Sequence, residues 1–146
     1  MAVEKLTVAC EFLEQALRLY YESYHFSAIH LAGAAEELLG AHLTLLGQSS
    51  TFHSYRTAGV ELANALGSGS PVTRKDMEGL LNHAKNRSKH MDLAEDNFIT
   101  FDPAEEAREL LDRAVSDYYH LMQYCQLPET PLVARFNREV LGARGA

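Results

Sequence analysis

Apolar residues recur at steps of three and four along most of this chain, which is the spacing of one face of an α-helix. Residues 25–46 are apolar on nearly every side, which favours a central helix, and Gly33 and Gly40 leave room for a neighbouring helix to approach closely. A weaker apolar stripe predicts a third helix over residues 51–66. The stripe of a first helix, over residues 3–24, consists of Leu6, Cys10, Leu13, Leu17, Tyr20 and Tyr24.

In the second half of the chain, capping residues predict where the helices begin. Thr73 and Asp76 have the spacing of a capping box and predict a fourth helix that runs to about residue 91. Asp102 followed by Pro103 predicts the start of a helix that continues to Cys125. The inward stripe of the fourth helix is predicted to consist of Met77, Leu80, Leu81, Ala84, Ser88 and Met91, beside a second stripe of His83, Asn86 and His90.

Short connections join these helices. Gly47 is a candidate left-handed cap, residues 67–71 form a Gly- and Ser-rich loop, and residues 92–101 favour an extended loop. Pro128 ends the long helix, and Thr130-Pro131 starts a short last helix at about residues 130–142. The pattern predicts an all-α, up-and-down bundle of four to five main helices plus a short C-terminal helix. We expect a single domain, residues 1–146, with its core at about residues 3–125.

Composition bears on nucleic-acid binding, on the state of the cysteines and on membrane insertion. The chain has 146 residues, of which 47% are hydrophobic, and a formal net charge of −7, which argues against nucleic-acid binding through the whole surface. Cys10 and Cys125 match no metal spacing, and we expect unpaired thiols in a reducing compartment. Charged residues interrupt the longest apolar stretch, and no signal peptide is visible at the start. We therefore expect a cytoplasmic protein with no membrane span.

Familiar catalytic and metal-binding motifs are missing from the sequence. A single Glu-x-x-His pair occurs, Glu22 with His25, whereas a two-metal bundle site needs such pairs on two facing helices, so neither a metal nor another cofactor is expected. The nucleophile elbow and the phosphate-binding loop are also missing. Glu36 and Glu37 stand in the most apolar helix, where a buried carboxylate needs a cation; Lys85, Arg87 and Lys89 are candidates. The alternative is that both carboxylates lie at the edge of the stripe and contact water.

The strongest chemical signal is a basic segment: five of the 13 Lys and Arg lie between positions 74 and 89. Within it, Lys85 could hold a phosphodiester, and His90 could act as general acid or base near neutral pH. The alternative is a solvated helix end, in which cations favour the macrodipole and His90 with Asp92 caps the last turn.

Two segments resemble the HEPN superfamily of small α-helical bundles, over roughly residues 5–125. Residues 24–39, with an aromatic start and an Ala-Ala-Glu middle, look like the family's central helix, and residues 85–90 look like its Arg-x4–6-His motif. Lys85 stands where ribonuclease members have Arg, an exchange that is not conservative at a phosphate. Residues 86–92 are also similar to an Asn-x-x-Lys-His-x-Asp segment found in a group of small bacterial proteins.

The resemblance implies a homodimer in which two motif helices meet in a cleft. On the first hypothesis the cleft binds nucleotide or RNA; if it is catalytic, it is a metal-independent ribonuclease with His90 as acid or base and Lys85 as phosphate clamp. On the second, the protein is a non-enzymatic interaction or accessory protein, and the same residues form a structural polar network around Glu36. The ligand-binding candidates are Asn86, Arg87, Lys89, Asp92 and Glu36.

Overall fold

The computed structural model describes residues 1–67, 69–92 and 94–145, with Glu95 described in its backbone only. Over these residues the chain is helical, without a strand, as the hydrophobic pattern predicts. Ser68 in the predicted loop at residues 67–71, and Leu93 in the predicted loop at residues 92–101, lie outside the described residues. The helices are α1 (Lys5–Tyr21), α2 (His25–Leu45), α3 (Thr51–Leu66), α4 (Arg74–Leu81), α5 (His83–Arg87), η1 (Ala94–Asn97, a 3₁₀ turn), α6 (Pro103–Leu121) and α7 (Pro131–Arg144).

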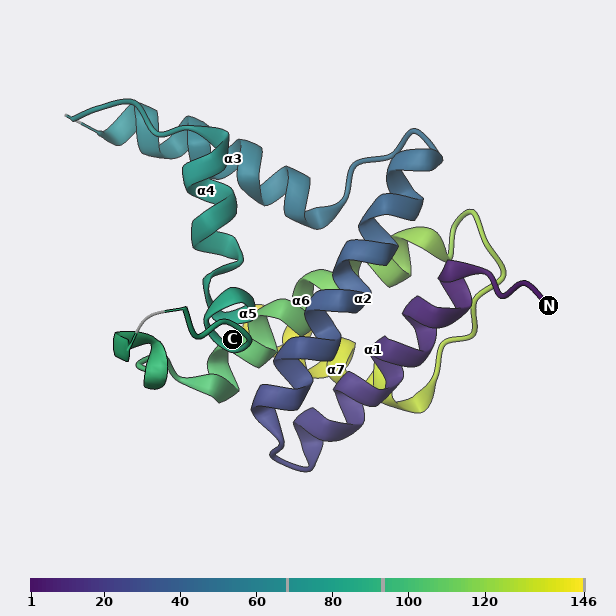
Figure 1. Cartoon of the computed structure of the whole chain (residues 1–146). Helices are drawn as coiled ribbons and strands as arrows, with labels where there is room; N and C mark the ends of the chain where they lie inside the picture. Colours follow the sequence, from purple (N-terminus) through teal and green to yellow (C-terminus); the bar gives the residue numbers. More distant parts are fainter. Residues whose placement is uncertain (68, 93, 146) are drawn as a thin grey trace.

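A bundle of α1, α2, α6 and α7 forms the body of the protein, and α3 and α4 project from it (Figure 1). Helix α2 packs against both α1 and α6, which makes it the central element predicted from its apolar surface. The core is built from buried side chains of all four helices, and through Val133, Phe136 and Val140 of α7 it extends beyond the expected limit at about residue 125. Its largest fully buried apolar side chains are Phe136, Leu13, Leu17, Ile29, Leu39, Leu43, Leu111, Leu121 and Val133.

Local capping signals are confirmed where the sequence placed them. The Thr73 hydroxyl accepts the Asp76 N–H at 3.1 Å, and the Asp76 carboxylate accepts the Thr73 N–H at 2.9 Å, so the capping box is complete. Asp102 caps α6 and Thr130 caps α7, each followed by proline in the first turn. Gly47 follows α2 with a φ of +74°, the left-handed conformation expected of it.

The predicted fourth helix is broken. It ends at Leu81, turns at Asn82 and resumes as the short α5, which stops at Arg87 rather than near residue 91. The Leu81 carbonyl, left without a helical partner at this end, accepts a hydrogen bond from Arg113 Nη2 at 3.1 Å. Leu80 of α4 and Met91, which lies beyond the end of α5, are exposed rather than facing inward as predicted.

Two further predicted boundaries are corrected. Helix α6 ends at Leu121 rather than continuing to Cys125, which lies in the turn that follows, half-buried. Residues 94–97 form a 3₁₀ turn within the loop expected to be extended. Cys10 and Cys125 are both free thiols, and burial raises the pKa of Cys10.

Helices α3 and α4 form a projecting arm, which we define as residues 51–81. Neither helix buries a residue among those described, although they pack against each other. The arm exposes several large apolar side chains, namely Tyr55, Leu62, Leu66 and Leu80. Its contact with the body depends on the start of α3 and the end of α4, where the polar groups of the next section lie.

Candidate functional site

A polar cleft of about 390 Å³ lies where the arm joins the body. Helix α2 supplies one wall, and the start of α3, the end of α4 and the start of α5 supply the other. Charged, amide and hydroxyl groups outnumber apolar side chains on these walls. The lining residues are Glu36, Glu37, Gly40, Ala41, Thr44, Ser50, Phe52, Glu78, Asn82 and Lys85.

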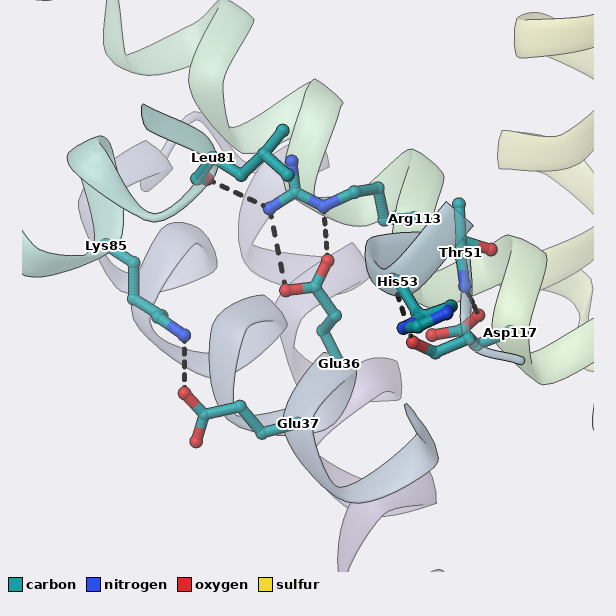
Figure 2. A network of polar contacts seen from close by, with 9 residues as sticks. Glu36, Glu37, Thr51, His53, Leu81, Lys85, Arg113 and Asp117 are labelled. Carbon is teal, nitrogen blue, oxygen red and sulfur yellow. Dashed lines mark hydrogen bonds and ion pairs between the residues drawn. The ribbon is translucent and has the colours of Figure 1, made fainter. Parts of the chain in front are cut away.

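A buried ion pair between α2 and α6 forms the floor of this region (Figure 2). The Arg113 guanidinium donates to both carboxylate oxygens of Glu36, from Nε and, at 3.5 Å, from Nη2. The two side chains are only 5% and 4% exposed, so both charges are taken out of water. Because Arg113 also holds the Leu81 carbonyl, this one guanidinium joins α6, α2 and the end of the arm.

Lys85 crosses from α5 to α2 and forms an ion pair with Glu37 (Figure 2). Its side chain is 6% exposed, whereas the Glu37 side chain is 65% exposed. The aliphatic stem lies against Gly33: a Cβ on that glycine would come within 2.9 Å of Lys85 Cγ. The close approach predicted at Gly33 is therefore made by a lysine stem, whose ammonium is already neutralised.

Substituting Gly33 with alanine is expected to lower the free energy of unfolding by about 1–2 kcal/mol. Overpacking against the buried Lys85 stem outweighs the gain of about 1 kcal/mol in helix propensity. Urea denaturation measures the change, and Gly79→Ala is the matched control. Gly79 is also helical but has open space around it, so alanine should stabilise there. Equal effects at the two glycines would contradict the packing of Lys85 described here.

A third ion pair and an aromatic ring complete the arm side of the cleft. Arg56 of α3 donates to Glu78 of α4 at 2.6 Å and thereby ties the two arm helices together. The Phe52 ring lies 5.9 Å from the guanidinium carbons of both Arg56 and Arg113. Each of the three carboxylates of the cleft thus has its own cation.

Asp117 of α6 anchors the start of α3. It is fully buried, and its Oδ1 accepts the Thr51 N–H at 2.7 Å. Burial raises the pKa of Asp117 to about 6, and the Thr51 hydrogen bond offsets part of that rise. Oδ2 has no hydrogen-bond partner among the described residues. Ser50, which precedes Thr51, caps α3 by accepting the His53 N–H at 3.1 Å.

The structure brings together only part of the predicted site. Lys85 and Glu36 both line the cleft, but Asn86, Arg87, Lys89, His90 and Asp92 do not. Arg87 instead forms an ion pair with Asp96, beside the 3₁₀ turn. Asn86, Lys89, His90 and Asp92 are exposed. Of the cations considered for the two glutamates, Lys85 does pair with Glu37, whereas Glu36 pairs with Arg113.

Sequence reasoning missed Arg113, Asp117, Phe52, Glu78 and Asn82. For Asp117 a signal was present, because the buried positions of α6 recur at 107, 110, 114, 117 and 121, a helical stripe that includes this one acid. A charge on an inward stripe calls for a buried partner. Arg113 precedes Asp117 by four residues on the same buried face and carries the same signal. Phe52, Glu78 and Asn82 have no local feature that distinguishes them from other residues of the arm and its end.

These features define an all-α protein with a polar cleft at the junction of a bundle and an arm. No protein-family model matches the chain, and neither a curated protein nor a solved structure matches it. Over the described residues, no three His, Cys, Asp or Glu side chains gather closely enough to hold a metal ion. In the same part of the chain, no helix combines the length and apolar character needed to cross a membrane.

Proposed function

We propose that this is a HEPN-like but non-enzymatic interaction or accessory protein, in which Lys85 serves structure rather than phosphate binding. The observation that carries the proposal is the Lys85 ammonium, which is buried and paired with Glu37. A phosphate clamp must present its charge to the ligand. Here the Lys85 ammonium already forms an ion pair with the Glu37 carboxylate. If the ammonium turned to bind a phosphate instead, Glu37 would lose its cation.

The surroundings of the segment also favour this interpretation. Arg87 is paired with Asp96, so a second cation of the segment is neutralised. Between residues 83 and 106, three Lys and Arg are outnumbered by six Asp and Glu. His90 is exposed but does not line the cleft that contains Lys85. A phosphodiester would meet a local excess of negative charge, which weakens binding to RNA.

The arm is the part of the protein that we assign to partner contact. Its exposed apolar side chains at Tyr55, Leu62, Leu66 and Leu80 suit association with another protein surface. We include in the proposal the homodimer that the HEPN resemblance implies, in a reducing cytoplasm where Cys10 remains a thiol. The polar groups at the junction would then fix the direction in which the arm projects.

The proposal predicts that purified protein does not cleave RNA in a His90-dependent way, in EDTA, at about pH 6–8, where an unperturbed His titrates. It also predicts that Lys85→Met lowers the free energy of unfolding by on the order of 1 kcal/mol. The ion pair with the exposed Glu37 is lost, while methionine keeps the apolar stem of the buried lysine. RNA cleavage assays and urea denaturation measure the two effects. Light scattering on the same samples should give the mass of two chains.

The control variant is Lys89→Met, which removes an exposed lysine of the same segment and should change stability by less than about 0.5 kcal/mol. Metal-independent cleavage that disappears in a normally folded His90→Ala variant would overturn the proposal in favour of the ribonuclease hypothesis. Two results together would support the non-enzymatic proposal. The wild type does not cleave RNA, and Lys85→Met lowers the free energy of unfolding whereas Lys89→Met does not.

A further inference from the structure

The cleft between α2 and the arm has the size and the polar groups of a small-molecule site. Its volume of about 390 Å³ falls within the range of ligand pockets. Ala41 and Phe52 give it apolar surface, while the rest of the wall is polar. The proposed interaction function assigns no ligand to this cleft.

Two buried oxygen atoms in this region have no hydrogen-bond donor among the described residues. Asn82 Oδ1 is buried on a residue that lines the cleft. Asp117 Oδ2 belongs to a side chain with no exposed surface, behind Gly40 and Ser50 of the cleft wall; a Cβ on Gly40 would lie 3.9 Å from it. A buried acceptor without a donor is costly, so such groups call for a partner.

The charges indicate which partner would suit. Lys85, Arg56 and Arg113 are each paired with one glutamate, and among their nitrogen atoms only Arg56 Nε is buried without an acceptor among the described residues. The side chains of Glu37 and Glu78 are 65% and 40% exposed, whereas the Lys85 side chain is 6% exposed. What a ligand meets from solvent is therefore mainly acceptor oxygen. An anion would be repelled, and a group rich in N–H donors would be favoured.

We propose that this cleft binds a small organic cation with several N–H donors, of the amine or guanidinium class. The N–H groups would reach Asn82 Oδ1 and the outward carboxylates, and the carbon skeleton would lie against Phe52 and Ala41. Because Glu37 belongs to α2 and Glu78 to α4, the bound cation bridges the body and the arm. The inference goes beyond the proposed interaction function and does not depend on it.

The experiment uses agmatine and 1,4-diaminobutane as probes, with 1,4-butanediol as the neutral control and succinate as the anionic one. Calorimetric titration and thermal unfolding of the full chain are the measurements. Both amines should bind and raise the melting temperature by several degrees at saturation, since a ligand that binds only the folded state stabilises it. The diol and succinate should do neither.

Variants of the cleft distinguish amine binding in the cleft from nonspecific attraction of amines to an acidic protein. Ala41→Leu fills the cleft at an exposed helical position and should weaken amine binding at least tenfold. Ala65→Leu, on the exposed surface of α3 away from the cleft, should leave binding unchanged. Asn82→Ala removes the unpartnered acceptor and supplies a second weakening variant, should leucine at position 41 disturb the fold.

The inference is overturned by any of three results. Neither amine binds the wild type; or the diol or succinate binds as well as the amines; or the amines bind Ala41→Leu and Asn82→Ala as they bind the wild type, which identifies a nonspecific attraction. A failure here leaves the non-enzymatic proposal standing, because RNA cleavage and amine binding are measured independently.

Discussion

Replacing Arg113 with methionine is expected to lower the free energy of unfolding by about 3–5 kcal/mol, the cost of leaving one partner of a buried ion pair without the other. Glu36 would remain 4% exposed with no cation, and the Leu81 carbonyl would lose its donor. Both losses fall at the junction of α2, α6 and the arm. Urea denaturation with linear extrapolation measures the change.

Two further variants test whether the loss of stability comes from the buried ion pair. Arg144→Met removes an exposed arginine that pairs with Asp112, and it should cost less than about 1 kcal/mol. The double variant Glu36→Leu with Arg113→Met replaces both buried charges by apolar groups and should recover most of the stability lost in the single variant. If Arg113→Met cost no more than Arg144→Met, the buried pair would not be holding the junction.

Replacing Asp117 with asparagine is expected to stabilise the protein at pH 7 and above by up to about 3 kcal/mol, which is the free energy equivalent of the pKa shift. Burial raises the pKa of Asp117 from 3.8 to about 6, so folding favours the neutral form. Between about pH 4 and pH 6 the folded state binds more protons than the unfolded state. Stability from this group therefore falls as the pH rises through that window, and asparagine mimics the neutral carboxyl without titrating.

The pH profile is the decisive measurement. Wild type should lose stability relative to Asp117→Asn as the pH rises from about 4 to 6, and the difference should be constant above that range. Asp92→Asn, at an exposed position, should run parallel to the wild type. A parallel profile for Asp117→Asn as well would mean that the buried carboxyl has no raised pKa. Lower stability of that variant at pH 8 would mean that the bond to Thr51 needs the carboxylate charge.

Much of the fold could be predicted from the sequence, because helix formation and capping depend on residues within one or two turns of each other. The capping box at Thr73, the Asp102 and Thr130 caps and the left-handed Gly47 all lie where local signals placed them. The break at Asn82 could not be predicted in the same way. The donor that satisfies the last carbonyl of α4 at this break is Arg113, a residue 32 positions later, which no local pattern reveals.

The sequence by itself determined that this is an all-α chain whose central helix carries two carboxylates and whose basic segment lies at residues 74–89. Only the tertiary structure decided which charges meet: Arg113 with Glu36, and Lys85 with Glu37. It also decided that His90 is exposed and does not line the cleft. In the part of the chain that the structure describes, it leaves Asn82 Oδ1 and Asp117 Oδ2 without a hydrogen-bond donor. The reason is physical: periodicity reports which face of a helix is buried, whereas an ion pair depends on which other helix covers that face.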